Sequence, residues 1–269
     1  MRAAMPEGDT LEKIATALDG RLRAAPVDDL QLRGRPLRRL RGRSVTGVEA
    51  RGKHLLIHLD DGSCLQSHLG MQGSWHRYRI GERWRKRPAR ASLVLRCGEQ
   101  VYVCFNAREA RWHPGASSLR DSAAGCLGPD LLAAATRAET IPARARRLLP
   151  PDELLVDMLL DQRVAAGIGN VYKSELMFVH RLAPEHTLDA VDNAMLEAVY
   201  ASAMQLLARN LHGGRRRTRF DNQRPERLWV YRRRGAICLR CNTARIRYAR
   251  LGRGHRSTYW CPACQSENG

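Results

Sequence analysis

Lysine and acidic residues are both scarce in this chain. Lysine occurs at only four of the 269 positions, and 27 acidic residues face 46 lysines and arginines, so the net charge is +19. A field this positive favours a polyanionic partner, and the planar guanidinium group of arginine matches phosphate geometry. Anionic membrane is the competing partner, but no basic amphipathic helix supports it. The composition therefore predicts a nucleic-acid-binding protein.

Long apolar runs are absent as well. No segment offers 18 consecutive apolar residues, which argues against a membrane span. The residues before Met5 are one methionine, one arginine and two alanines, without the apolar core of a signal peptide. We therefore expect a cytoplasmic, nucleoid-associated protein with no membrane partner.

The pattern of apolar residues changes along the chain. Apolar positions at helical spacing predict a helix over 7–23, and short β-type runs separated by turn signals fill 28–115, at 44–50, 54–59, 63–70, 91–97 and 100–106. Helical spacing returns at 152–162, 170–180 and 190–211. We expect an α+β multidomain chain with a β-sandwich domain at 6–130, a linker at 131–150, a helical domain at 151–225 and a cysteine unit at 229–265.

Eight cysteines divide into two classes. The spacing C-x2-C occurs twice, nineteen residues apart, which is the pattern of a four-thiolate zinc site formed by Cys238, Cys241, Cys261 and Cys264. Two disulfides or coincidence are the alternatives, and disulfides fit poorly in a chain without a secretion signal. Four thiolates leave no open position for a substrate, so we expect one structural Zn²⁺. The other cysteines have no paired spacing and are expected to be buried, unreactive thiols: Cys64, Cys97, Cys104 and Cys126.

A glycine-rich turn precedes the predicted helix at 170–180. Gly167 and Gly169 stand directly before Asn170. Glycine lets backbone approach a ligand, and a helix N-terminus presents free N–H groups, so this turn is a candidate phosphate site. The alternative is ordinary helix-start chemistry, since such residues are common at helix caps.

Taken together, four short motifs resemble those of the formamidopyrimidine-DNA glycosylase and endonuclease VIII family, most closely its actinobacterial endonuclease VIII-like branch. They are Pro-Glu-Gly at 6–8, Gly-Lys-His at 52–54, Gly-Ile-Gly-Asn at 167–170 and the terminal four-cysteine unit. The resemblance implies a β-sandwich, a helix-two-turn-helix domain and a zinc finger, in a monomer that acts on damaged DNA. It implies a bifunctional DNA glycosylase and apurinic/apyrimidinic lyase of base excision repair.

The resemblance also implies residue roles. Pro6 is the nucleophile through a secondary N-terminal amine, Glu7 is the general acid and base, and Lys53 contacts phosphate or sugar. Gly169 and Asn170 lie at a DNA phosphate, and Arg256 binds phosphate and assists the second elimination. The alternatives are a helix-start proline for Pro6 and a surface carboxylate for Glu7.

Pro6 raises a question of processing. An α-amine titrates near pH 8 and a lysine near 10.4, so a free α-amine is the better nucleophile at neutral pH. Within a chain the proline nitrogen is an amide and cannot react in this way. We therefore expect translation to begin at Met5, followed by removal of Met5. If residues 1–5 are retained, the alternative is a non-catalytic binder of damaged or abasic DNA. A zinc-ribbon protein of general architecture is a third candidate.

Two further segments bear on the substrate. Met71 stands at a turn and is either a wedge that props open the duplex or a core residue. The formamidopyrimidine branch carries Asp-Pro-Arg-Arg-Phe-Gly where this chain reads Asn-Ala-Arg-Glu-Ala-Arg at 106–111. This departure favours oxidised pyrimidines over 8-oxoguanine as the lesion. The resemblance implies β-elimination and then δ-elimination after the base has left.

Overall fold

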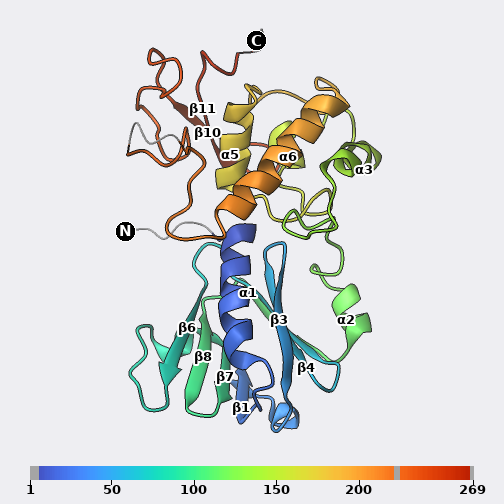
Figure 1. Cartoon of the computed structure of the whole chain (residues 1–269), viewed down its shortest axis with the longest axis vertical. Helices are drawn as coiled ribbons and strands as arrows, with labels where there is room; N and C mark the ends of the chain where they lie inside the picture. The colour runs from blue at the N-terminus through green and yellow to red at the C-terminus, as the bar shows by residue number, and fades with distance from the viewer. Residues whose placement is uncertain (1–5, 221–224, 267–269) are drawn as a thin grey trace. The chain divides into compact units, whose positions relative to one another are not determined.

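The computed structural model describes residues 6–220 and 225–266. The chain divides into two compact units: unit 1 ends at Cys126 and unit 2 begins at Leu127. Each unit is described by itself (Figure 1). The expected α+β architecture is confirmed, with a β-sandwich and leading helix in unit 1 and with helices and a four-cysteine hairpin in unit 2.

Unit 1 is a sandwich of two antiparallel sheets. The five-stranded sheet has the order β2-β1-β7-β8-β6 and the four-stranded sheet has the order β3-β4-β5-β9. The strands are β1 (Asp29–Leu32), β2 (Arg35–Pro36), β3 (Val45–Arg51), β4 (His54–Leu59), β5 (Cys64–His68), β6 (Ser74–Arg79), β7 (Ala91–Cys97), β8 (Gln100–Phe105) and β9 (Glu109–His113). The 3-10 turns η1 (Arg38–Leu40) and η2 (Pro88–Arg90) lie between strands, and the short helix α2 (Ala116–Arg120) follows β9.

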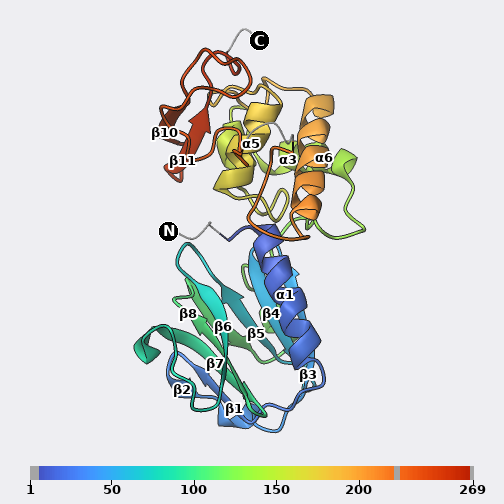
Figure 2. The ribbon, with the colours of Figure 1, turned by 60° about the vertical axis from the view of Figure 1, so that its left-hand side comes forward.

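The leading helix α1 (Gly8–Leu22) packs beside β3 (Figure 2). Its apolar residues recur at helical spacing and are buried at Leu11, Ala15, Leu18 and Leu22. They join one apolar core with the inner faces of both sheets. The N-terminal end of the helix is therefore fixed to the sandwich, and Pro6 and Glu7 are fixed with it.

All five β-type runs predicted in unit 1 form strands. The pattern did not predict β1, β2, β6 and β9. Both β6 (SWHRYR) and β9 (EARWH) alternate large and charged residues and carry few aliphatic side chains. These strands are stabilised by pairing with β8 and β5 respectively, which a local pattern cannot detect.

The described part of unit 2, residues 127–220 and 225–266, contains four α-helices, α3 (Ile141–Leu148), α4 (Leu155–Met158), α5 (Asn170–Val179) and α6 (Asn193–Arg209), and a 3-10 turn, η3 (Ala138–Thr140). Residues 131–150, expected as a linker, include α3. Ile141, Ala145 and Leu149 are buried in the same apolar core as α5 and α6. This segment is therefore part of the helical unit.

The predicted helix over 152–162 is wrong in extent, because only Leu155–Met158 is α-helical. The amide of Gln162 holds the loop that follows the helix: its Nε2 donates to the carbonyls of Leu160 and Ile168, and its Oε1 accepts from the N–H of Gly167 at 3.1 Å. These bonds fold residues 160–169 into a loop that leads into α5.

The cysteine unit is a two-stranded hairpin of β10 (Arg247–Leu251) and β11 (Arg256–Trp260), and β11 packs against α5. A small apolar cluster that includes Phe178, Val230 and Ile246 surrounds two of the cysteines. In the part of the chain that the structure describes, no helix is long and apolar enough to span a bilayer.

Candidate active site

Glu7 lies at the N-cap of α1, directly after Pro6. Its carbonyl accepts the N–H groups of Thr10 at 2.9 Å and Leu11 at 3.1 Å, which anchors the start of the helix. Its residue surface is 0% exposed, which is unusual for a carboxylate. The alternative of a surface glutamate is therefore excluded, and Pro6 stands beside a buried carboxyl group.

Lys53 lies in the two-residue turn between β3 and β4. Arg51 pairs with His54 across this turn, and Gly52 adopts φ +58°, a conformation that favours glycine and is typical of tight hairpins. The register of the sheet continues this row from His54 to His68 and from His68 to Glu109. The turn with Lys53 therefore lies at the same end of the sheet as the β5–β6 and β8–β9 connections.

Met71 lies in the β5–β6 connection and its residue surface is 71% exposed. This exposure excludes the core alternative. The turn is held from within, since the N–H of Gly70 donates to Nδ1 of His68 at 3.2 Å and that of Gly73 donates to the carbonyl of Leu69 at 2.9 Å. A Cβ on Gly70 would lie 3.0 Å from the Cβ of Arg108, so the Met71 turn and the β8–β9 connection are neighbours.

A buried polar chain crosses the sheet behind Lys53. Nε2 of Gln66 lies 2.8 Å from Nδ1 of His54, Oε1 of Gln66 lies 2.6 Å from Nε2 of His113, and Nδ1 of His113 lies 3.1 Å from Oγ of Ser118. The His54 and His68 rings are 4.9 Å apart. Burial, then the charges of His68 and Lys53, lowers the pKa of His54 to about 3. Both imidazoles that bond Gln66 are therefore neutral at pH 7.

This chain makes the stability of unit 1 dependent on pH. A histidine whose folded pKa is depressed is protonated first in the unfolded chain, so its contribution to stability is lost as pH falls below about 6.5. Between pH 7.5 and pH 5 we expect the His54 term to reduce the free energy of unfolding by about 2 kcal/mol. Urea denaturation at the two pH values measures this loss. The His54→Gln variant serves as the control, and its free energy of unfolding should fall by about 2 kcal/mol less between the two pH values. An equal fall in both proteins would contradict the lowered pKa of His54.

In unit 2, Gly169 is the N-cap of α5 and Asn170 is its first residue. Gly167 adopts φ +123°, which admits the sharp approach to the helix. Asn170 is buried to 8% exposure at this end. The N-terminus of α5 has the donors and the positive dipole end that a phosphate site requires.

Arg256 begins β11 and is exposed on the hairpin turn. Two contacts fasten this hairpin to the helices. Nζ of the fully buried Lys173 donates to the carbonyl of Ser257 at 3.1 Å and to Oγ1 of Thr258 at 2.7 Å, directly beside Arg256. On the other side of the turn, the N–H of Arg253 donates to the Asp157 carboxylate at 2.8 Å.

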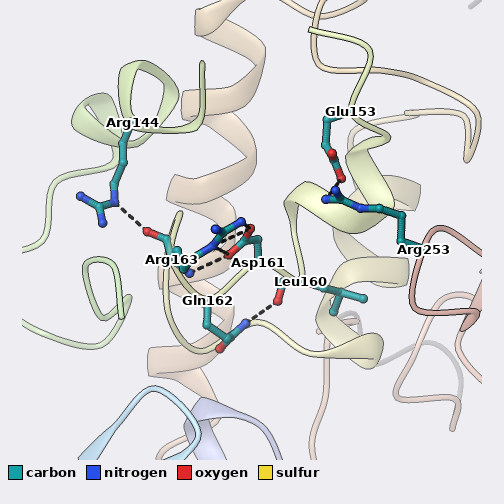
Figure 3. A network of polar contacts seen from close by, with 7 residues as sticks. All are labelled: Arg144, Glu153, Leu160, Asp161, Gln162, Arg163 and Arg253. Atoms are coloured by element: carbon teal, nitrogen blue, oxygen red, sulfur yellow. Dashed lines mark hydrogen bonds and ion pairs between the residues drawn. The ribbon is translucent and has the colours of Figure 1, made fainter. Parts of the chain in front are cut away.

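A salt bridge completes this attachment. A terminal nitrogen of the Arg253 guanidinium lies 2.5 Å from Oε1 of Glu153 (Figure 3). Gly252 adopts φ +70°, and a Cβ there would overlap the carboxylate of Asp157. Only glycine therefore allows the turn to approach Asp157. Helix α5 and the segment 153–157 thus hold the Arg256 turn from two sides.

The four predicted zinc ligands converge. Sγ atoms of Cys238 and Cys264 are 3.8 Å apart, as are those of Cys241 and Cys261, and all four lie within 4.8 Å of one another. Zn–S bonds of about 2.3 Å in a tetrahedron place sulfurs about 3.8 Å apart. The donor set and the spacing fit a metal of the zinc type. Hydrogen bonds from Thr243 and Ala244 lower the pKa of Cys241 to about 6, which favours its thiolate.

Sequence reasoning missed three supporting residues of unit 2. They are Lys173, Asp157 and Glu175. The buried Glu175 carboxylate accepts the N–H groups of Trp229, Val230 and Tyr231 at 2.7 to 2.9 Å and the hydroxyl of Thr218, and so ties α5 to the segment before the cysteines. The rarity of lysine was a signal for Lys173. The two acids gave no local signal, because their partners lie 43 or more residues away.

The predicted residues thus form two groups. Pro6, Glu7, Lys53 and Met71 lie in unit 1, and Asn170, Arg256 and the cysteines lie in unit 2. The first group presents a proline nitrogen, a carboxyl group and a lysine amine, and the second presents polar and cationic donors suited to phosphate and a cluster of thiols.

Models of known protein families match both units of the chain. Residues 5–111 match the model of the formamidopyrimidine-DNA glycosylase N-terminal domain, and residues 127–221 match the model of the formamidopyrimidine-DNA glycosylase H2TH domain. The chain is 37% identical to "Probable endonuclease 8 2" of Streptomyces coelicolor, covering 97% of this chain and 94% of that protein. It is 35% identical to "DNA-(apurinic or apyrimidinic site) lyase Nei2" of Mycolicibacterium smegmatis, covering 97% and 99%.

A solved structure has the same fold. The complex of Lactococcus lactis Fpg with abasic-site DNA superposes with a TM-score of 0.79 at 20% identity, covering 97% of this chain and 100% of that one. The matches to both domain models and to full-length relatives lead to one conclusion: the chain belongs to the formamidopyrimidine-DNA glycosylase and endonuclease 8 family.

Proposed function

We propose that this chain excises oxidised pyrimidines from DNA with Pro6 as nucleophile. As a member of its family it is a bifunctional DNA glycosylase and apurinic/apyrimidinic lyase of base excision repair. The observation that carries the residue assignment is the fully buried carboxylate of Glu7 directly after Pro6 at the start of α1. A carboxyl group removed from water and fixed beside a proline nitrogen is suited to exchange a proton with groups attached to the same sugar.

The reaction follows from the chemistry of a secondary amine. The free Pro6 nitrogen forms a bond to C1′ of the damaged nucleoside, the C1′–base bond breaks, and the base leaves with a proton supplied by Glu7. The Pro6 nitrogen loses its proton, the C1′–O4′ bond of the sugar breaks as O4′ takes up a proton, and an iminium ion forms between Pro6 and C1′. This ion accepts the electron pair released when a C2′ proton is removed, and the C3′–oxygen bond then breaks. Loss of the C5′–oxygen bond follows in the same way.

The remaining assignments concern phosphate. Lys53, on its tight turn, and Arg256, on the hairpin held by Lys173 and Asp157, would each hold a backbone phosphate of the damaged strand, and Asn170 with Gly169 would hold another at the start of α5. Met71 would enter the space left by the displaced base, because an exposed apolar side chain on a fixed turn can replace a stacking partner.

The four cysteines would hold one Zn²⁺. Its contribution is structural, since four thiolates fill the tetrahedral coordination sphere and leave no position for water or substrate. The ion would stabilise the hairpin that carries Arg256. We also propose that the protein acts as a monomer on damaged DNA in the nucleoid region of the cytoplasm.

The lesion preference rests on the segment 106–111. This connection has no phenylalanine, and its arginines do not form an adjacent pair. We expect this chain to excise thymine glycol or 5-hydroxycytosine at least about tenfold faster than 8-oxoguanine opposite cytosine. Gel assays with one lesion per duplex measure this ratio. Equal or faster release of 8-oxoguanine would overturn the preference but leave the nucleophile assignment intact.

A further inference from the structure

The connection between β6 and β7, residues 80–90, is dense in arginine. We call it the arginine loop. It holds Arg83, Arg85, Arg87 and Arg90, one lysine and a single acid, Glu82. All four arginines are exposed. None of the ion pairs found among the described residues uses any of them. The loop therefore displays charge that the fold itself does not neutralise.

The arginine loop is ordered by contacts on its inner side. The Trp84 ring stacks on Tyr78 with centroids 6.0 Å apart and meets Phe105 edge-on at 5.6 Å. The N–H of Arg85 donates to the hydroxyl of Tyr78 at 3.1 Å, and Nζ of Lys86 donates to Oγ of Ser74 at 2.8 Å. These contacts cover an apolar cluster on the outer face of the five-stranded sheet.

Burial alternates along the loop as it does along a strand. Trp84 and Lys86 are half-buried, whereas Arg83, Arg85 and Arg87 are exposed. Three guanidinium groups are consequently presented on one side of a backbone that is already fixed. Such preorganisation reduces the entropy lost when a long side chain binds phosphate.

The loop starts and ends at opposite ends of β6. At its start the N–H of Ile80 donates to the carbonyl of Glu99 at 3.1 Å, and at its end the carbonyl of Arg90 accepts the N–H of Asn106 at 2.9 Å. Asn106 begins the connection that neighbours the Met71 turn. The loop thus begins roughly 20 Å from the candidate active end of unit 1, the length of a six-residue strand, and runs back toward it, with Lys86 bonded to Ser74 near that end.

We propose that the arginine loop binds the phosphate backbone of the DNA flanking the lesion, out to about six base pairs from it. This inference rests on the proposed function, because the lesion must occupy the end of unit 1 with Lys53 and Met71. Duplex DNA rises 3.4 Å per base pair, so roughly 20 Å corresponds to about six base pairs. DNA is favoured over a membrane surface because Ile80 is the one large apolar side chain exposed among residues 80–90, too little for insertion.

The test varies the length of the DNA. The triple variant Arg83→Gln/Arg85→Gln/Arg87→Gln is compared with the native chain on duplexes of about 11 and about 30 base pairs, each with a central tetrahydrofuran abasic analogue. On the long duplex we expect about tenfold weaker binding and a salt dependence smaller by up to about 2.7 in the log–log slope. On the short duplex, which ends about five base pairs from the lesion, the loss of affinity should be smaller, at most about threefold.

A charge-matched control distinguishes phosphate binding by the arginine loop from the effect of lowering the net positive charge. Arg38→Gln/Arg41→Gln/Arg120→Gln removes three exposed arginines elsewhere in unit 1 and should leave both affinities nearly unchanged. Equal losses on both duplexes, equal losses in both triple variants, or no loss at all would overturn the inference. Loss of binding to anionic vesicles without any change on the long duplex would assign the loop to a membrane instead. If the native chain fails to bind the abasic analogue, the proposed function fails rather than the role of the loop.

Discussion

Protein that keeps residues 1–5 in front of Pro6 is expected to cleave abasic DNA at least about a thousandfold more slowly than protein that begins at Pro6. The reason is chemical. An amide nitrogen has no available electron pair and cannot form an iminium ion, whereas a free secondary amine can. Residues 1–5 themselves lie outside the described part of the chain, so the effect rests on the bond to Pro6 alone. Single-turnover cleavage of a duplex with one abasic site measures both rates.

The Glu7→Gln variant in the protein that begins at Pro6 is the matched control. It removes the acid and preserves the amine. Release of a damaged base should fall by about 10² to 10⁴, because a poor leaving group needs a proton. Cleavage of a preformed abasic site should be affected far less, since no base has to leave. If the two activities fell together, the assignment of Glu7 as acid for the base would be wrong.

Substitution of a proposed zinc ligand has the second large expected effect. Binding of structural zinc by small zinc-finger peptides contributes about 10 to 16 kcal/mol of apparent free energy, which the hairpin cannot replace from its small apolar cluster. Cys238→Ser should therefore lose the bound ion and the ordered hairpin. Because Arg256 lies on that hairpin, we expect about a hundredfold weaker binding to abasic DNA and mainly the β-elimination product.

Cys126→Ser is the control for this experiment. Cys126 is exposed, so the expectation that it is buried like Cys64, Cys97 and Cys104 is wrong, and it stands apart from the four-cysteine cluster. This variant should keep one zinc per chain, measured by atomic emission, and native affinity. A Cys238→Ser protein that retained stoichiometric zinc and full δ-elimination would contradict the structural role of the ion.

The elements that local chemistry specifies were predictable from the sequence. The run VYVCF in β8 is buried on both sides between the sandwich core and the Trp84 cluster, so it is continuously apolar. The C-x2-C spacing predicts a metal site directly. In the same way, a glycine before Lys53 predicts a tight turn between two strands. These features depend on neighbours in the chain, which a single sequence displays.

Features that depend on distant partners were not predictable. Residues 152–162 have helical spacing, but the N–H of Leu155 donates to the distant carbonyl of His186, the carbonyl of Gln162 accepts the N–H of Gly128, and only Leu155–Met158 is helical. In the sequence, Asp157 cannot be distinguished from a surface acid. Its role is visible only in the structure, where it lies against Gly252 and Arg253. Trp84 could equally have been part of a mobile basic loop, and only its stacking on Tyr78 shows that the arginines around it are fixed.

The measurement that tests the central claim most directly is borohydride trapping on a DNA strand with one abasic site. Protein that begins at Pro6, verified by intact mass, is compared with protein that retains residues 1–5, and the adduct is located by peptide mapping. The account predicts a covalent adduct on Pro6 in the first protein and no adduct in the second. An adduct on Lys53 or another lysine, or no adduct in either protein, would contradict it.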